Sequence, residues 1–140
     1  MPVPSVVLDT NIIVSAHLKP HALERSILDI AIASRLRWYA SEEILREYEQ
    51  VLFRPKFKIE TTALHASFRQ MYSAAVVVSP KVRVHAALDP SDNIFLECAQ
   101  EACSDYLVTG NKRDFPAEWC GTRIVSSREL VEVFIPALKK

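Results

Sequence analysis

Short runs of apolar and β-branched residues alternate along the chain with longer stretches in which apolar residues recur every three or four positions. A short continuous apolar run is typical of a strand buried on both faces, and the longer period is typical of an amphipathic helix. The pattern predicts strands at residues 5–8, 37–40, 76–78, 82–84, 106–109 and 124–125. It predicts helices at residues 11–16, 21–34, 41–53, 61–76, 91–103 and 127–134.

The order of these elements indicates the fold class. Strands that alternate with helices favour a parallel sheet, because each helix carries the chain back to the same end of the sheet. We therefore expect an α/β protein, a three-layer α/β/α sandwich with a mostly parallel central sheet. Residues 1–140 contain no linker, repeat or low-complexity tract, so we expect one domain.

The composition narrows the class of protein. The chain is 49% hydrophobic and 24% charged, which supplies a packed core and excludes a disordered chain. Its apolar runs are far shorter than a membrane span, and its first residues lack the pattern of a secretory signal. Its cysteines have no CxxC spacing and indicate neither a disulfide framework nor a zinc site. We therefore expect a cytoplasmic protein with no membrane partner.

Acidic residues near strand ends are the first candidates for chemistry. In an open α/β sheet, ligands bind beyond the carboxyl ends of the strands. Asp9 ends the first predicted strand, and Asn111 and Asp114 follow the strand at residues 106–109. Three further acids belong to helices near this edge: Glu47, Asp89 and Asp92.

Negative charge is concentrated in one segment of an otherwise neutral chain. Residues 89–118 hold seven acids against two bases, Lys112 and Arg113, whereas the whole chain has 17 of each. Carboxylates brought together raise each other's pKa unless a cation compensates them. Hard oxygen ligands suit Mg²⁺ or Mn²⁺ better than zinc.

Each acid also has an ordinary explanation when it is taken alone. Asp9 fits a turn or a helix cap, and Asp92 fits the first turn of a helix, where a negative charge is favourable. Glu47 is one of four glutamates in its predicted helix. Further acids and the histidines are expected at the surface or in loops: Glu97, Glu101, Asp105, His17, His21, His65 and His85.

Four segments in this order resemble the PIN-domain family. They are VLDTN at residues 7–11, SEEILRE at 41–47, DPSDNIFLECA at 89–99 and YLVTGNKRDF at 106–115. The chain looks closest to small prokaryotic PIN proteins that are relatives of the VapC toxins of toxin–antitoxin systems. The segment LFRPKF at residues 52–57 is also similar to this subgroup, so the likeness covers essentially the whole chain.

The resemblance implies a metal-dependent nuclease that acts on RNA. The family holds Mg²⁺ or Mn²⁺ with three or four acids, and the first three positions match Asp9, Glu47 and Asp92. The fourth position falls at Asn111, which departs from the family because an amide brings no charge.

The resemblance also implies supporting residues around these ligands. Asp114 and Asp89 are candidates to supply the charge that Asn111 lacks. Asn11 and Thr109 match the polar residues that orient the family's carboxylates. Basic residues should border an acidic cleft that takes RNA, and the candidates are Lys112 and Arg113, then Arg54 and Lys56.

The predicted function is therefore endoribonuclease, as the toxin of a pair with a cognate antitoxin protein. One alternative is a catalytically weak PIN domain that acts as an RNA-binding or protein-interaction module, which Asn111 keeps open. Another is a phosphatase with Asp9 as nucleophile, but that class needs a second Asp where this chain has Asn11.

A homodimer is also predicted, because the apolar side chains of two helices and one strand exceed what a 140-residue core readily hides. These side chains are Leu28, Ile32, Trp38, Tyr39, Phe68, Met71 and Tyr72.

Overall fold

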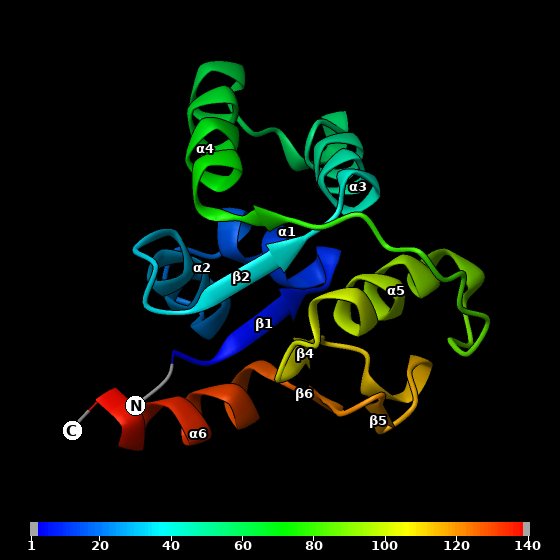
Figure 1. The fold of residues 1–140 in the computed structure, drawn as a ribbon. Helices are drawn as coiled ribbons and strands as arrows, with labels where there is room; N and C mark the ends of the chain where they lie inside the picture. Colours follow the sequence, from blue (N-terminus) through cyan, green and yellow to red (C-terminus); the bar gives the residue numbers. More distant parts are fainter. Residues whose placement is uncertain (1–2, 139–140) are drawn as a thin grey trace.

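The computed structural model describes residues 3–138, and the side chains of residues 3–134. A six-stranded sheet in the order β3-β2-β1-β4-β6-β5 forms its centre (Figure 1). All neighbouring strands pair in parallel except β5 and β6. The strands are β1 Ser5–Leu8, β2 Arg37–Ala40, β3 Val76–Val77, β4 Tyr106–Val108, β5 Glu118–Trp119 and β6 Thr122–Val125.

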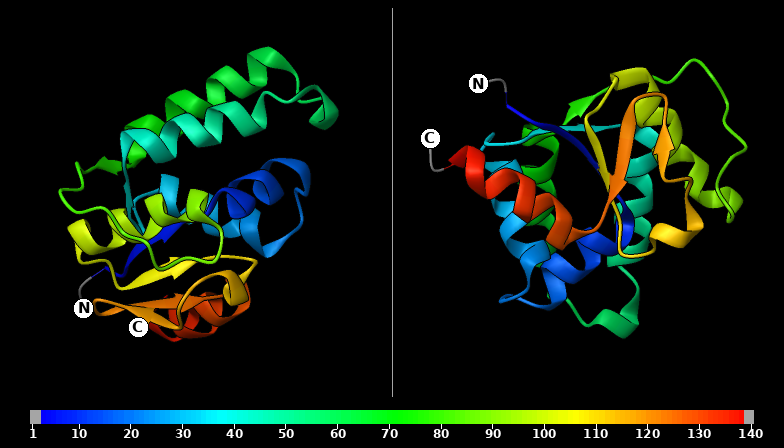
Figure 2. Two further views of the ribbon diagram at one scale, coloured as in Figure 1. Left: turned by 90° about the vertical axis from the view of Figure 1, so that its right-hand side faces the viewer. Right: turned by 90° about the horizontal axis from the view of Figure 1, so that it is seen from below.

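Helices cover both faces of this sheet, which confirms the predicted α/β/α sandwich. Helix α5 packs on one face, whereas α1, α2 and α6 lie on the other; α3 and α4 pack together beyond the β3 edge (Figures 1 and 2). The helices are α1 Thr10–Leu18, α2 Leu23–Ile32, α3 Glu42–Leu52, α4 Thr61–Ala74, α5 Asn93–Ala102 and α6 Ser127–Leu138. Three short 3₁₀ turns are η1 Pro55–Phe57, η2 Pro90–Asp92 and η3 Lys112–Asp114.

Strand β1 is the centre of the core. All four of its residues are buried, as a strand covered on both faces requires. It pairs with β2 on one side and β4 on the other, so Leu8 lies opposite Val108. The carboxyl ends of these central strands point toward α3 and α5 in Figure 1.

The region after β3 corrects two predictions. Residues 82–84 form no strand; instead the Val84 N–H donates to a carboxylate oxygen of Glu97 at 3.0 Å. Glu97 is therefore buried rather than at the surface. The sequence pattern missed this because the partner of Glu97 is a backbone group of a segment that only the fold brings alongside α5.

Strand β5, and with it the hairpin to β6, is also absent from the predicted elements, whereas residues 124–125 of β6 were predicted as a strand. Its two-residue turn, Cys120–Gly121, has positive φ at both positions (49° and 89°), which suits the twist of a tight hairpin. A strand of two residues is too short to leave an apolar period in the sequence.

The surplus of apolar side chains does not exist. Leu28, Trp38, Phe68 and Met71 are all buried within the single chain. Among the side chains expected to need a partner, Tyr72 is exposed (41%), whereas Ile32 and Tyr39 are partly buried. The argument from the four buried side chains was wrong: α2 and α4 pack against each other with Leu28, Phe68 and Met71 in the core, and Trp38 is buried in β2.

No helix within residues 3–138 is both long enough and apolar enough to span a membrane.

Candidate active site

Four separate segments meet in one pocket at the carboxyl edge of the sheet. The pocket has a volume of about 430 Å³ and is lined by Asp9 with the first turns of α1, by α3, and by the segments around η2 and η3. It brings together every acid or amide that the sequence placed in the site: Asp9, Asn11, Glu47, Asp89, Asp92, Asn111 and Asp114. We call this cavity the acid pocket.

Asp9 is the most buried of these acids, with 5% of its surface exposed. Its N–H continues the β1–β4 ladder by donating to the Val108 carbonyl at 3.0 Å, which fixes the backbone. One carboxylate oxygen accepts from the Thr10 N–H (2.8 Å) and the other from the Thr109 hydroxyl (2.7 Å). Burial raises the pKa of Asp9 to about 6, although both hydrogen bonds oppose the shift; Glu47 and other nearby charges add to it.

Glu47 reaches the pocket from α3 and accepts a hydrogen bond from the Thr10 hydroxyl. Helix α3 begins at Ser41, whose side chain caps the Ile44 N–H at 3.2 Å. Thr10 therefore contacts both acids: its N–H binds Asp9 and its hydroxyl binds Glu47.

Tyr48 is a supporting residue that the sequence did not reveal. Its hydroxyl donates to the Leu8 carbonyl, directly before Asp9, and its ring is fully buried. Strand β2, which pairs with β1, ends at Ala40, where the chain leaves the sheet to start α3. Tyr48 therefore ties α3 to the end of β1. Nothing in the sequence distinguishes this tyrosine from an ordinary core aromatic residue.

Asp92 ends η2 and is only half-buried. Asp89 caps the turn by accepting from the N–H (3.0 Å) and the hydroxyl (2.9 Å) of Ser91. Burial, followed by the charges of Asp9, Asp89 and other acids, raises the pKa of Asp92 to about 7. No hydrogen bond is among the causes of this shift, so nothing opposes it.

Asn93 positions the segment that carries Asp89 and Asp92. Its buried side-chain oxygen accepts from the N–H groups of Ala86 (3.1 Å) and Ala87 (2.9 Å). The next N–H, that of Leu88, donates to the Asp114 carbonyl at 2.8 Å, which joins the η2 and η3 sides of the pocket. No sequence pattern indicated this role, because Asn93 lies in a stretch with helical spacing.

Asn11 and Thr109 hold the end of β4 against α1. The Asn11 side-chain oxygen accepts from the Gly110 N–H at 3.2 Å, and the Thr109 hydroxyl oxygen accepts from the Asn111 N–H at 3.0 Å. These contacts bring Asn111 and then Asp114 into the lining of the pocket. Asn111 is exposed, so its amide is available from solvent.

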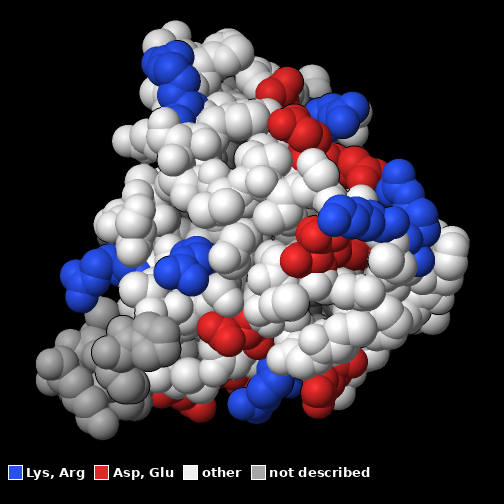
Figure 3. Space-filling model, in the orientation of Figure 1, with Lys and Arg blue, Asp and Glu red and all other residues white. Residues whose placement is uncertain are grey.

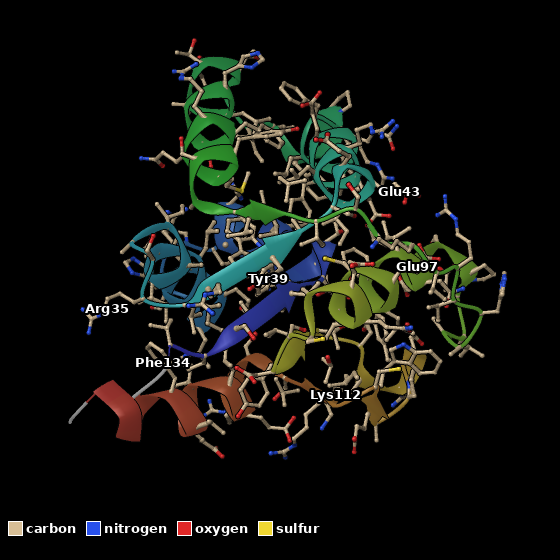
Figure 4. All side chains as sticks on the ribbon, in the orientation of Figure 1. Arg35, Tyr39, Glu43, Glu97, Lys112 and Phe134 are labelled. Atoms are coloured by element: carbon tan, nitrogen blue, oxygen red, sulfur yellow. The ribbon has the colours of Figure 1, made fainter. Side chains whose placement is uncertain are left out.

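The four residues predicted to bind RNA lie in three different surroundings. Lys112 is paired with Glu129 at 2.7 Å, on the β6–α6 side of the molecule (Figure 4). Arg113 lines a hollow beside the acid pocket. Arg54 and Lys56 lie at η1 and do not line the pocket.

The donor groups of the acid pocket fit a hard divalent cation. Its polar lining consists of carboxylate, amide and hydroxyl oxygens, and none of the described lysines, arginines or histidines lines it. Within the described residues, no three acidic, histidine or cysteine side chains already form a group that could hold a metal ion. The carboxylates therefore share one pocket without forming a closed ligand cluster.

Comparisons with known proteins bear on the family and the fold of this chain. A family model described as "PIN domain" matches residues 5–113. An uncharacterised protein of Methanocaldococcus jannaschii, MJ1680, is 27% identical over 110 residues, covering 76% of this chain and 70% of the relative. Among solved structures, a chain of VapBC2 from Rickettsia felis, crystallised with a promoter DNA fragment, superposes with a TM-score of 0.54. The identity is 16%, over 87% of this chain and 98% of that one, so this likeness concerns the fold.

Proposed function

This chain belongs to the PIN-domain family, and from that premise we propose that it is a divalent-metal-dependent endoribonuclease. Its substrate is RNA, whose phosphodiester bonds it hydrolyses. Its biological role is that of the toxin in a toxin–antitoxin pair.

The observation that carries this proposal is the acid pocket itself. Five carboxylates from four segments line one cavity with no described base among them. Such a charge arrangement is costly unless a cation compensates it, and burial, with a further contribution from the neighbouring acids, raises the pKa of both Asp9 and Asp92. Oxygen donors select Mg²⁺ or Mn²⁺.

In this proposal Asp9, Glu47 and Asp92 hold the cation, and Asp89, Asp114 and the amide oxygen of Asn111 are further donors. Once bound, the cation supplies Lewis-acid activation of water and positive charge at the phosphate. Thr109 and Thr10 hold the two oxygens of Asp9 in fixed directions, and Thr10 does the same for Glu47.

A cleavage assay tests the enzyme proposal. Purified protein is incubated with RNA in Mg²⁺, in Mn²⁺ and in EDTA, beside Asp9→Asn. We expect cleavage only with metal and wild-type Asp9. Cleavage that is equal in EDTA, or equal in the variant, would contradict it.

The partners follow from the same proposal. The structural relative comes from a complex named VapBC2, which supports a cognate antitoxin for this chain. An adjacent gene for a small DNA-binding protein, and co-purification of its product, would test this.

A homodimer stays a prediction. The exposed side chains of Tyr72 on α4 and of Val76 and Val77 on the edge strand β3 are one surface for it. Light scattering decides the oligomeric state.

A second candidate is a catalytically weak PIN domain that binds RNA or protein. Asn111 favours it, because the fourth acidic position lines the pocket with an uncharged amide. Metal binding and RNA binding without metal-dependent cleavage would support this candidate over the nuclease.

A further inference from the structure

The acid pocket is the middle one of three connected hollows. On one side it shares Asn111 and Asp114 with a hollow of about 460 Å³. On the other it shares Glu47 and Ser91 with a hollow of about 340 Å³. The three hollows are therefore neighbours on the surface; we call them together the track, with the acid pocket between the other two.

One face of α3 forms a wall of the track. Glu43, Arg46, Glu47 and Gln50 follow at helical spacing, and all four line the hollow beyond the acid pocket. The start of α5 faces them through Ile94. Acidic and basic side chains gather along this α3 and α5 side of the molecule in Figure 3.

Each outer hollow holds one arginine without a carboxylate partner among the described residues. Arg46 has as its contact the backbone carbonyl of Glu42, at 3.5 Å. Arg113 lines the opposite hollow, is exposed, and takes part in none of the ion pairs between described side chains.

The neighbouring cations are already engaged. Lys112 is bound to Glu129, and Arg83 is bound to Glu43 (3.3 Å) and Glu97 (3.2 Å), the two acids labelled on α3 and α5 in Figure 4. Arg83 thereby neutralises Glu43, the second acid on the α3 wall, and leaves the charge of Arg46 available.

We propose that a single RNA strand lies along the track, with Arg46 and Arg113 each binding a backbone phosphate on opposite sides of the acid pocket. This inference rests on the proposed function and adds to it two phosphate-binding positions. An acidic centre repels a polyanion, so binding needs cations on both flanks to hold the strand across it. Arginine forms strong, directional hydrogen bonds with phosphate. Gln50, in the hollow that holds Arg46, and Ser91, which that hollow shares with the acid pocket, offer uncharged hydrogen-bonding groups.

The salt dependence of RNA binding tests the proposal. Anisotropy of a labelled RNA of about 12 nucleotides is measured in Ca²⁺ at several KCl concentrations, and gels verify that the RNA stays intact. Each phosphate contact on a single strand contributes about 0.7 to the slope of log affinity against log salt. We expect Arg46→Gln and Arg113→Gln each to lower the slope by about 0.7, and the double variant by about 1.4.

Arg69→Gln is the matched control. Arg69 is exposed on α4 and lines a separate hollow that shares no residue with the track. If Arg46→Gln or Arg113→Gln shifts the slope no more than this control does, the proposal is wrong, and a polypeptide becomes the better occupant for the track. Failure of the proposed function is a different result: wild-type protein would not cleave RNA in Mn²⁺, yet the two slopes would still fall.

Discussion

The acid pocket has two walls that are built differently. The inner wall, formed by Asp9, Thr10 and Glu47, lies on β1, α1 and α3, and hydrogen bonds from Thr10 and Thr109 hold its carboxylates. The outer wall, formed by Asp89, Asp92 and Asp114, lies on two 3₁₀ turns. Its backbone is positioned mainly by Asn93 and by one hydrogen bond from Leu88 to Asp114.

Burial alone would rank the acids in the wrong order. Asp9 is more buried than Asp92, yet its pKa is raised less, to about 6 against about 7. The difference arises because Thr109 and Thr10 stabilise the charged form of Asp9, whereas Asp92 faces four other acids without such a bond. Hydrogen bonds from the protein therefore compensate the charge of Asp9 in the inner wall, whereas no hydrogen bond offsets that of Asp92 in the outer wall.

Removal of the Asp9 carboxylate from the inner wall should have the largest effect on RNA cleavage. Asp9→Asn keeps the shape of the side chain and an oxygen that can accept from Thr10, so the fold should survive. Cleavage of RNA should fall by at least about 100-fold, because several kcal/mol of charge stabilisation at the phosphate is lost. Steady-state kinetics check this against Asp29→Asn, an exposed acid on α2. Equal losses in both variants would contradict a specific role for Asp9.

Substitution of Asp92 in the outer wall should lower activity without lowering the stability of the metal-free protein. Asp92→Asn should also lose activity by orders of magnitude, yet the metal-free protein should be as stable as wild type or more stable, because one repulsive charge is gone. Saturating Mn²⁺ should stabilise wild type by about 2.7 kcal/mol at 100 times Kd, and the variant by less. Thermal melts with and without Mn²⁺ measure both. A destabilised but fully active Asp92→Asn would assign Asp92 to a helix-capping role only.

The pH dependence of stability should reflect the same charge. The pKa of Asp92 is about 7 in the folded protein, against an ordinary value of 3.8. Between these values Asp92 stays protonated in the folded state and is ionised in the unfolded state. The contribution of Asp92 to stability is therefore full below about pH 4 and is lost as pH rises to about 7. Solvent screening of this half-exposed group limits the loss to about 1–2 kcal/mol.

Comparison of the wild type with Asp92→Asn isolates the contribution of Asp92 to the pH dependence of stability. His17 has a pKa lowered by burial and destabilises the protein in acid, but it is present in both proteins and cancels from their difference. Urea titrations without metal at pH 4.5, 6 and 8 should show the advantage of the variant growing with pH. A difference that is constant over this range would contradict the raised pKa.

The two walls also differ in how far the sequence revealed them. The strand-end pattern made Asp9 a candidate, because an acid that ends a buried β-branched run is a local signal, although Asp9 alone also fits a turn or a helix cap. Glu47 and Asp92 had ordinary local explanations, and their selection came from the resemblance to a family. Tyr48 was missed because its partner, the Leu8 carbonyl, lies on another element far away in the sequence, and Asn93 because its partners belong to the irregular segment before its helix. The prediction for Glu97 was wrong for the same reason. Local patterns predict elements, whereas side chains that bind remote backbone require the fold.

The smallest effect should come from the fourth acidic position. Asn111→Asp adds a carboxylate to the outer wall, where Asp89, Asp92 and Asp114 already repel one another. Because residue 111 is exposed, the free energy of unfolding of the metal-free protein should fall by only about 0.5 kcal/mol. The added charge should tighten Mn²⁺ binding about 3- to 10-fold, which is about 0.7–1.4 kcal/mol, and calorimetry measures it.

Gln70→Asp on α4 adds the same charge at a remote, exposed position and should leave Mn²⁺ affinity unchanged. Asn111→Ala, which removes the amide oxygen, should weaken binding if that oxygen reaches the cation. If both substitutions at residue 111 leave the affinity unchanged, the fourth position lies outside the metal site, and the outer wall ends at Asp114.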